Sequence, residues 1–221
     1  MATNFTTTLA AIETDFETES GLDIDVVSGS TGKLYAQIIN GAPYDVFLAA
    51  DQARPEHLIA NGHAAPASRF TYAIGKLALW SPTDPEVSAN TLTAPETVRL
   101  ALANPDLAPY GLAAVQLLER LDLDTQLRSK FVFGENVGQA FAFVSTGNAQ
   151  LGFVSVAQVL TLPETRKGSV WLVPPQLHDP IAQDAVLLTR GADNPTARAF
   201  LAYLKSDAAH EIIRRSGYES E

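Results

Sequence analysis

Apolar residues at helical spacing open the chain. Because they lie three or four positions apart, they fall on one face of a helix and predict an amphipathic one. This stripe consists of Phe5, Leu9, Ile12 and Phe16. Thr3 or Asn4 is the predicted N-cap of the helix, and Gly21 is its predicted end.

The chain then alternates predicted strands and helices. Apolar and acidic residues alternate over 22–27, which predicts a half-buried strand. A turn rich in hydroxyl groups and glycine, residues 28–35, leads into a helix that ends at Gly41. A short apolar strand is predicted at 45–49 and a further helix at 51–60. This order is typical of a parallel α/β sheet.

A long predicted strand over 71–80 has Gly75 in its middle, so it can bend and carry the chain from one domain to the next. Beyond it the pattern restarts, and residues 184–189 are the predicted second crossing. Further strands are predicted at 99–103, 130–133, 150–155 and 169–173, and helices at 109–118, 136–147, 194–204 and 208–215. We therefore predict two α/β lobes, residues 1–78 with 188–221 and residues 79–187.

Composition narrows the class of protein. The chain has 221 residues, 46% of them hydrophobic and 18% charged, as expected of a globular protein with a sizeable core. Its net charge of −10 argues against nucleic acid and anionic membranes as partners. Without cysteine there are no disulfides or thiolate-bound metals. The chain opens abruptly ahead of its first helix, so we expect a signal peptide and part of a first strand to have been removed.

Familiar catalytic and metal-binding motifs are missing. Residues 29–33 resemble the end of a phosphate-binding P-loop, but Leu34 stands where Ser or Thr is required and Val27 where the first glycine is required. The four histidines show no ligand spacing and are predicted to lie on the surface; they are His57, His63, His178 and His210. No nucleophile is paired with a base, so we expect a protein that is not an enzyme.

Short polar or glycine-bearing sequences precede four predicted helices. They are Thr3-Asn4, Ser30-Thr31-Gly32, Tyr110-Gly111 and Asn136-Val137-Gly138. A helix N-terminus carries unpaired amides and favours an anion, so helix starts that converge would hold a small oxyanion without a cationic side chain. The alternative is that each hydroxyl merely caps its own helix, as Thr31 would.

At these residues the sequence resembles the periplasmic molybdate-binding proteins. In the first half the resemblance covers residues 2–5, 28–38 and 41–51; in the second half it covers 103–105, 108–111, 134–140 and 146–154. It implies a two-lobed type II periplasmic binding protein fold with two crossover strands and a cleft between the lobes. It also implies the substrate-binding component of an ABC transporter, with molybdate or tungstate as ligand and neither a cofactor nor a metal cation.

By motif position, the resemblance assigns seven residues to the oxyanion: Thr3, Asn4, Ser30, Thr31, Tyr110, Val137 and Ser155. The resemblance implies that Asn4 contacts the anion by its side chain or its backbone, that Thr31 gives its hydroxyl and its amide, and that Tyr110 and Val137 contribute backbone amides. Two positions depart from the family pattern. Ser155 stands where many members have tyrosine, and Thr31 where many have serine. Both departures bear on the choice among molybdate, tungstate and sulfate.

The resemblance further implies a membrane permease as partner, a periplasmic location and a monomer. Three other functions remain open from the sequence. One is a receptor for another small anion, such as sulfate or an organic carboxylate. The second is the ligand-sensing domain of a regulator, although no DNA-binding module accompanies this acidic chain. The third is an enzyme that uses the same cleft.

Overall fold

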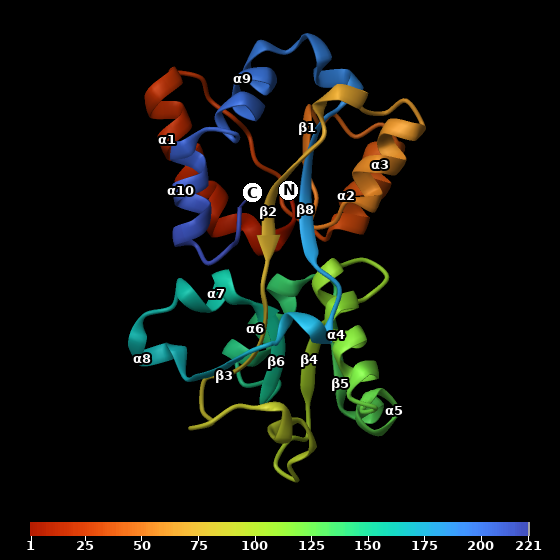
Figure 1. The fold of residues 1–221 in the computed structure, drawn as a ribbon, viewed down its shortest axis with the longest axis vertical. Helices are drawn as coiled ribbons and strands as arrows, with labels where there is room; N and C mark the ends of the chain where they lie inside the picture. Colours follow the sequence, from red (N-terminus) through yellow and green to blue (C-terminus); the bar gives the residue numbers. More distant parts are fainter. Residues whose placement is uncertain (221) are drawn as a thin grey trace. The chain divides into compact units, whose positions relative to one another are not determined.

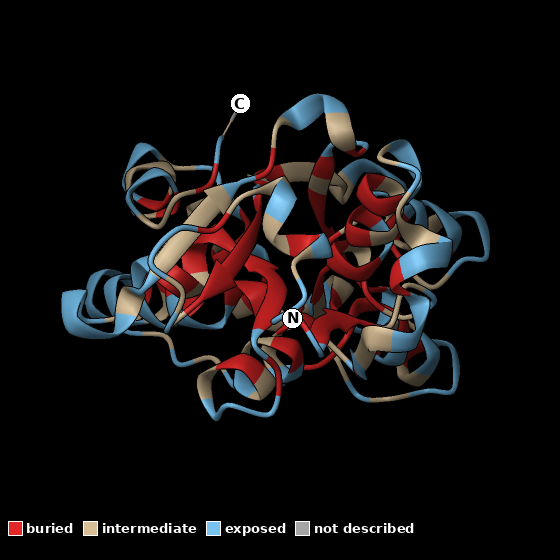
Figure 2. Ribbon diagram, turned by 90° about the horizontal axis from the view of Figure 1, so that it is seen from below, coloured by how far each residue is buried: buried red, intermediate tan, exposed pale blue. Residues whose placement is uncertain are grey.

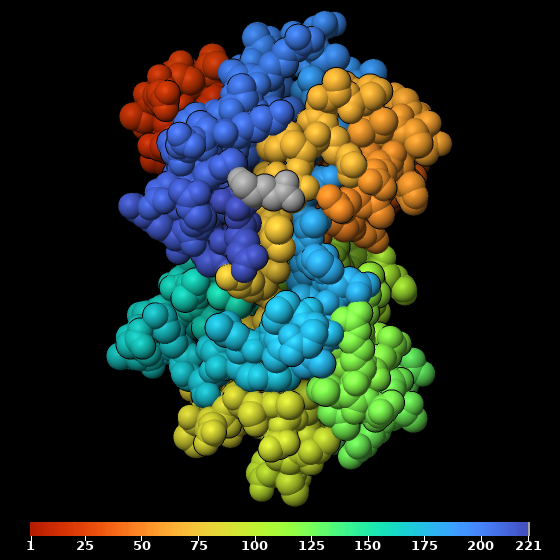
Figure 3. All heavy atoms as spheres, in the orientation of Figure 1, coloured from red at the N-terminus to blue at the C-terminus, as the bar shows by residue number. Residues whose placement is uncertain are grey.

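The structure is a computed structural model that describes residues 1–220, and the chain forms two compact units. Unit 1 comprises residues 1–75 and 182–221, and unit 2 comprises residues 76–181. Figure 3 shows the red and orange N-terminal part beside the dark blue C-terminal part, both within unit 1. The α/β fold with two chain crossings is confirmed; the lobe bounds predicted at 78/79 and 187/188 stay a prediction.

Unit 1 has a three-stranded sheet in the order β1-β8-β2, in which β1 and β8 run antiparallel. In Figure 1, α1, α9 and α10 lie on one side of these strands and α2 and α3 on the other. The strands are β1 (Val46–Leu48), β2 (Phe70–Gly75) and β8 (Ile181–Leu187); the helices are η1 (Thr3–Phe5), α1 (Thr6–Ser20), α2 (Thr31–Ile39), α3 (Ala53–Ala60), η2 (Pro66–Ser68), η6 (Thr189–Asp193), α9 (Pro195–Tyr203) and α10 (Asp207–Arg215).

The first apolar stripe is buried as predicted. Phe5, Leu9, Ile12 and Phe16 are each at most 2% exposed. Phe16 packs edge to face on Phe200 of α9, with ring centroids 5.5 Å apart. The prediction that Thr3 or Asn4 caps α1 is wrong: the residue before α1 is Phe5, because a turn of 3-10 helix over Thr3–Phe5 precedes the α-helix.

The predicted strand at 22–27 is also wrong, since these residues belong to none of the strands of the described chain. Its alternation is visible in burial, because Leu22 and Ile24 are half-buried whereas Asp23 and Asp25 are exposed. A strand needs a neighbour to share backbone hydrogen bonds. Strand pairing occurs only just beyond this segment, where Ala2 and Gly29 form an isolated parallel bridge.

Unit 2 has a five-stranded mixed sheet in the order β5-β4-β6-β3-β7. β4 runs parallel to β5 and to β6, whereas β3 runs antiparallel to β6 and β7. The strands are β3 (Leu77–Ser81), β4 (Leu100–Ala103), β5 (Phe131–Gly134), β6 (Leu151–Ser155) and β7 (Ser169–Leu172); the helices are η3 (Ala89–Thr93), α4 (Pro109–Arg120), α5 (Asp124–Leu127), η4 (Arg128–Lys130), α6 (Val137–Ser145), α7 (Val156–Leu160), α8 (Glu164–Lys167) and η5 (Pro175–Leu177).

The strand predicted as continuous over 71–80 is two strands in two sheets. β2 ends at Gly75 and β3 begins at Leu77, and the two belong to different units. The Lys76 carbonyl between them accepts the Val156 amide at 3.0 Å. The predicted bend at Gly75 therefore coincides with a complete break in the strand.

Figure 2 shows that the strands are mostly buried, while much of the helix surface is exposed. In unit 2 one buried cluster joins β3, β4 and β6 to α4, and it includes Tyr110 and Val137.

The prediction that His178 lies on the surface is wrong. His178 is 7% exposed, and its Nδ1 lies 2.7 Å from the Asp179 carbonyl oxygen. Within residues 1–220, no helix has the length and apolar content that crossing a bilayer requires.

Gly111 fixes how closely α4 approaches β4. A Cβ atom at this position would lie 2.2 Å from the Ala103 carbonyl oxygen and 2.7 Å from its carbon. Such a contact forces the helix start away from the strand end. Glycine is therefore required here by the close approach of two backbone segments.

We expect Gly111→Ala to lower the free energy of unfolding by about 1–3 kcal/mol, the usual cost of overpacking. The matched control is Leu112→Ala on the same helix, where the side chain is 49% exposed. Urea unfolding measures both. An unchanged midpoint for Gly111→Ala would show that α4 accommodates the methyl group without strain.

Candidate functional site

In unit 1, the predicted turn at 28–35 contains two buried hydroxyl groups with different tasks. Ser30 precedes α2 and its Oγ accepts the Lys33 amide at 3.3 Å, so Ser30 is the N-cap. Thr31 is the first residue of the helix, and its Oγ1 accepts the Ala50 amide at 3.1 Å. Ser30 and Thr31 are 2% and 1% exposed. The alternative that Thr31 caps its own helix is therefore wrong.

The Thr31 hydroxyl keeps a proton to donate. A hydroxyl group carries one donor as well as its acceptor lone pairs, and the bond from Ala50 uses only an acceptor position. The first amides of α2 have no acceptor within the helix. The helix start thus presents a hydroxyl proton and backbone amides, all of which favour a negatively charged partner.

Thr3 and Asn4 are brought to this turn by backbone pairing. The Thr3 amide donates to the Gly29 carbonyl at 3.1 Å, and the Ala2 amide donates to the Leu48 carbonyl at 3.0 Å. The first residues of the chain therefore lie against the ends of two neighbouring segments, one leading to α2 and the other being β1. Four of the predicted site residues, Thr3, Asn4, Ser30 and Thr31, are collected in unit 1 by this pairing.

The Asn4 side chain is held in a buried polar network. Its Nδ2 donates to Gln183 Oε1 at 2.7 Å and to the Tyr218 hydroxyl at 3.2 Å. The Tyr72 hydroxyl donates to the same Gln183 oxygen at 3.2 Å, and the Tyr218 hydroxyl donates to the Asn4 carbonyl at 2.6 Å. Asn4 is therefore held by two residues, Gln183 and Tyr218, and these bonds take both protons of its side-chain amide.

The side-chain amide of Gln183 adds one further hydrogen-bond donor beside Asn4. It is completely buried, and its Nε2 has no hydrogen-bond partner among residues 1–220. A buried amide nitrogen of this kind is costly unless something accepts its protons. Gln183, Tyr72 and Tyr218 were missed from the sequence because their positions depend on long-range contacts, which no local motif signals.

In unit 2, the predicted site residues follow three adjacent parallel strands. Tyr110 lies at the start of α4 after β4, and Val137 begins α6 after β5. Ser155 is the last residue of β6 and precedes α7. Because the carboxyl ends of parallel strands share one edge of the sheet, the three helix starts share that edge too. Tyr110, Val137 and Ser155 are all buried.

Ser155 and Tyr110 are in direct contact. The Ser155 hydroxyl donates to the Tyr110 hydroxyl at 3.2 Å, and the Ser155 amide donates to Gln158 Oε1 at 3.0 Å. At the neighbouring helix, Asn136 caps α6 by accepting the Gln139 amide at 2.9 Å. That bond leaves the first two amides of α6, on Val137 and Gly138, without an acceptor in the helix.

Positive charge contributes little to either set of residues. Lys33 follows the Thr31 turn, but its side chain is exposed. Over residues 1–220, no three His, Asp or Glu side chains gather closely enough to hold a metal ion. Both sets consist of neutral donors, namely backbone amides at helix starts, hydroxyl groups and amide side chains.

We expect Ser155→Ala and Tyr110→Phe to be coupled by about 0.5–1.5 kcal/mol, because each removes one end of the same hydrogen bond. A double-mutant cycle in urea measures the coupling, with the exposed Ser129→Ala replacing Ser155→Ala as the control pair. Additive effects of Ser155→Ala and Tyr110→Phe would mean that this contact contributes nothing to stability.

Comparison with known proteins shows the family to which the chain belongs. The family model for bacterial extracellular solute-binding proteins matches residues 1–219. The molybdate-binding protein ModA of Azotobacter vinelandii is 47% identical over 220 residues, which cover 99% of this chain and 87% of that protein. ModA of Rhodobacter capsulatus is 41% identical over 222 residues, covering 100% of this chain and 87% of that protein.

A solved structure of a molybdate-binding protein has the same fold as this chain. The periplasmic molybdate-binding protein of Azotobacter vinelandii superposes with a TM-score of 0.95 and 41% identity, over 100% of this chain and 97% of that one. Members of the matched family are solute-binding proteins and not enzymes, as was predicted for this chain. The chain therefore belongs to the bacterial extracellular solute-binding protein family and, within it, to the group that these molybdate-binding proteins represent.

Proposed function

We propose that the protein is the substrate-binding component of an ABC transporter and that it binds molybdate. The observation that carries the proposal is the Ser30–Thr31 helix start. There a buried threonine hydroxyl keeps its proton while Ser30 caps the helix. Identity of 47% to a molybdate-binding protein over nearly the whole chain supports the choice of anion.

The donors are suited to a tetrahedral oxyanion that stays charged. A hydrogen bond to a charged group contributes about 1.5–3 kcal/mol, and a helix N-terminus adds about 0.3–1 kcal/mol. A few such bonds hold a dianion without an arginine or a lysine. Neutral donors also set a size filter, because a smaller anion such as sulfate leaves some buried donors unpaired, and each unpaired donor costs free energy.

We further propose that one anion takes donors from both units. In unit 1 these are Thr31, the amides near Ser30 and the Thr3–Asn4 segment. In unit 2 they are the amides of Tyr110 and Val137, with Ser155 holding the Tyr110 hydroxyl in place. Binding by donors on two units favours the arrangement in which both reach the anion, so the ligand shifts the population toward that state.

Transport implies the other proposed properties. The partner is the membrane permease of the transporter, the location is the periplasm after removal of a signal peptide, and the protein acts as a monomer. Its net charge of −10 argues against nucleic acid as a partner. Tungstate is proposed as a second ligand because it has the same charge and tetrahedral shape.

We expect Thr31→Ala to weaken molybdate binding roughly 10- to 100-fold, the loss of one hydrogen bond to a charged group. Thr31→Ser should retain most of the affinity because it keeps the hydroxyl. Thr7→Ala, at an exposed position of α1, is the matched control. Isothermal titration of all variants with molybdate, tungstate, sulfate and phosphate measures the effects.

Either of two results would contradict the proposal. Equal binding of sulfate would make the protein a general oxyanion receptor, and unchanged affinity in Thr31→Ala would remove that hydroxyl from the site. Hydrogen exchange in the presence of molybdate tests the role of both units. Slower exchange at Thr31 alone, with Tyr110 and Val137 unaffected, would confine the site to unit 1.

A further inference from the structure

In unit 1, the side-chain amides of Asn4 and Gln183 meet in an arrangement that leaves donors and acceptors unmatched. Both protons of the Asn4 amide are taken, one by Gln183 Oε1 at 2.7 Å and one by the Tyr218 hydroxyl at 3.2 Å. Gln183 has the opposite imbalance, because its Nε2 carries two protons and finds no acceptor among residues 1–220. One amide thus has no proton left for a ligand, while the other has two protons without a partner.

The Tyr72 hydroxyl adds a second mismatch. It lies 3.2 Å from Gln183 Oε1 and 3.1 Å from the Ala49 carbonyl oxygen, and both of these atoms are acceptors. A phenol has a single proton, so a full hydrogen bond to one of them excludes a full bond to the other. The oxygen of Gln183 therefore faces a hydroxyl whose proton another acceptor also needs.

Half a turn of both amides about their last side-chain bonds removes these mismatches. Oxygen and nitrogen exchange places in such a turn, and the amide keeps its shape. Gln183 Nε2 then donates to Asn4 Oδ1 and to the Tyr72 hydroxyl, whose proton goes to Ala49. The turn costs the bond from Asn4 to Tyr218, but the Tyr218 hydroxyl keeps its own bond to the Asn4 carbonyl at 2.6 Å. Asn4 Nδ2 gains two protons that are available to a ligand.

The groups around the pair are fixed, so the amides are the parts that can turn. The Phe5 ring packs edge to face on Tyr72 and on Tyr218, with ring centroids 4.9 and 5.3 Å apart. Next along β8, the buried Asp184 carboxylate forms an ion pair with Arg69 at 2.8 Å. These contacts hold the two tyrosine rings and the backbone of β8. The last torsion of an amide side chain is softer, because its energy wells are broad.

The pair adjoins the helix start that is proposed to bind the anion. The Ala49 carbonyl, which contacts the tyrosine hydroxyl, is followed by the Ala50 amide, which donates to Thr31 Oγ1 at 3.1 Å. Asn4 is 4% exposed, whereas Gln183 is completely buried. Asn4 is therefore the member of the pair that can reach a ligand, and Gln183 acts through it.

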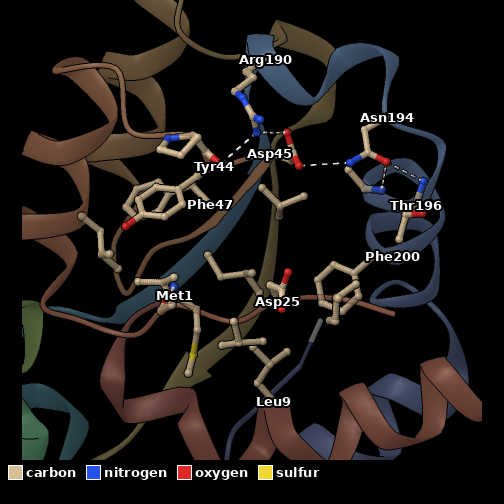
Figure 4. A pocket seen from close by; sticks show the side chains of 18 of the residues that line it. Met1, Leu9, Asp25, Tyr44, Asp45, Phe47, Arg190, Asn194, Thr196 and Phe200 are labelled. Atoms are coloured by element: carbon tan, nitrogen blue, oxygen red, sulfur yellow. Dashed lines mark hydrogen bonds and ion pairs between the residues drawn. The ribbon is translucent and has the colours of Figure 1, made fainter. Parts of the chain in front are cut away.

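The unpaired amide of Gln183 does not open into the groove that unit 1 contains elsewhere. Met1, Leu9 and Phe200 are among the residues that line this groove, and Figure 4 shows their side chains around it. Neither Asn4 nor Gln183 belongs to its lining. A ligand in the groove would therefore not supply the acceptor that the Gln183 amide lacks.

We propose that Gln183 is a positioning residue of the anion site and that the Asn4–Gln183 pair turns when the anion binds. Without the anion, the Asn4 protons point to Gln183 and Tyr218. With the anion, Gln183 Nε2 holds Asn4 Oδ1, and the Asn4 amide presents its protons to the ligand. The turn is driven by the anion because a hydrogen bond to a charged group is stronger than one between neutral groups. This inference rests on the proposed function as an anion receptor.

NMR of side-chain amide protons tests the turn directly. The signals of Gln183 are assigned through bonds in the isotope-labelled wild-type chain, together with those of Gln37, whose Oε1 also accepts a tyrosine hydroxyl, at 2.9 Å. On addition of molybdate we expect the Gln183 protons to move downfield and to exchange more slowly, because they gain acceptors, whereas the Gln37 protons stay unchanged. Unchanged Gln183 signals at saturation would overturn the proposal, as would hydrogen-bonded Gln183 protons before molybdate is added.

Binding by Gln183→Met tests whether this residue acts through Asn4. Methionine keeps the length of the side chain but cannot hold Asn4 Oδ1. We expect the affinity for molybdate to fall roughly 3- to 10-fold, the range for one neutral hydrogen bond, and Gln37→Met to leave it unchanged. In an Asn4→Ala background, Gln183→Met should have no further effect. An equal loss in both backgrounds would show that Gln183 does not act through Asn4.

The outcomes distinguish this inference from the proposed function. If the wild-type chain binds molybdate and Gln183→Met binds it equally well, the positioning role is wrong and the function stands. If the wild-type chain binds none of molybdate, tungstate, sulfate and phosphate, the function is wrong and the turn with it. The NMR measurement uses the wild-type chain, so it decides the question even if Gln183→Met fails to fold.

Discussion

Both parts of the proposed site depend on the amides at the helix starts, which have no acceptor within their own helices. Each helix begins directly after a strand or a paired segment, so its first amides face the edge of a sheet. The remaining polar groups are arranged around these amides. Ser30 and Asn136 cap the third amide of their helices, and Gly111 lets α4 press against Ala103. The field of a helix start is short-ranged, so it acts locally in a protein of strongly negative net charge.

Much of the fold is predictable from local patterns. The stripe from Phe5 to Phe16 and the hydroxyl-rich turn at 28–35 give α1 and the start of α2, because spacing and turn chemistry are local properties. The break at Gly75 was visible as a bend, although its division of one apparent strand between two sheets was not. That division is set by which partner strands each half meets.

The candidate residues could be nominated from motifs, but their contacts could not. No pattern indicates that Asn4 meets Gln183 or that Ser155 donates to Tyr110, because these pairs are 179 and 45 residues apart in the sequence. The strand predicted at 22–27 failed for the same reason. Its alternation is an intrinsic property, whereas strand formation depends on a neighbour along its whole length. His178 was misplaced because burial of a single polar residue leaves no periodic signal.

The division of tasks between Ser30 and Thr31 has a consequence for altering the protein. Ser30 caps the helix, and Thr31 carries the hydroxyl whose proton is available to a ligand. The side chain at position 31 can therefore be changed without removing the helix cap. The cap is thereby independent of position 31, but the Thr31 hydroxyl also accepts the buried Ala50 amide, and a residue without an acceptor there would leave that amide unpaired. At a position that is 1% exposed only small side chains fit, and among them serine keeps an acceptor for the Ala50 amide, so the range of substitutions that can alter anion selectivity here is narrow.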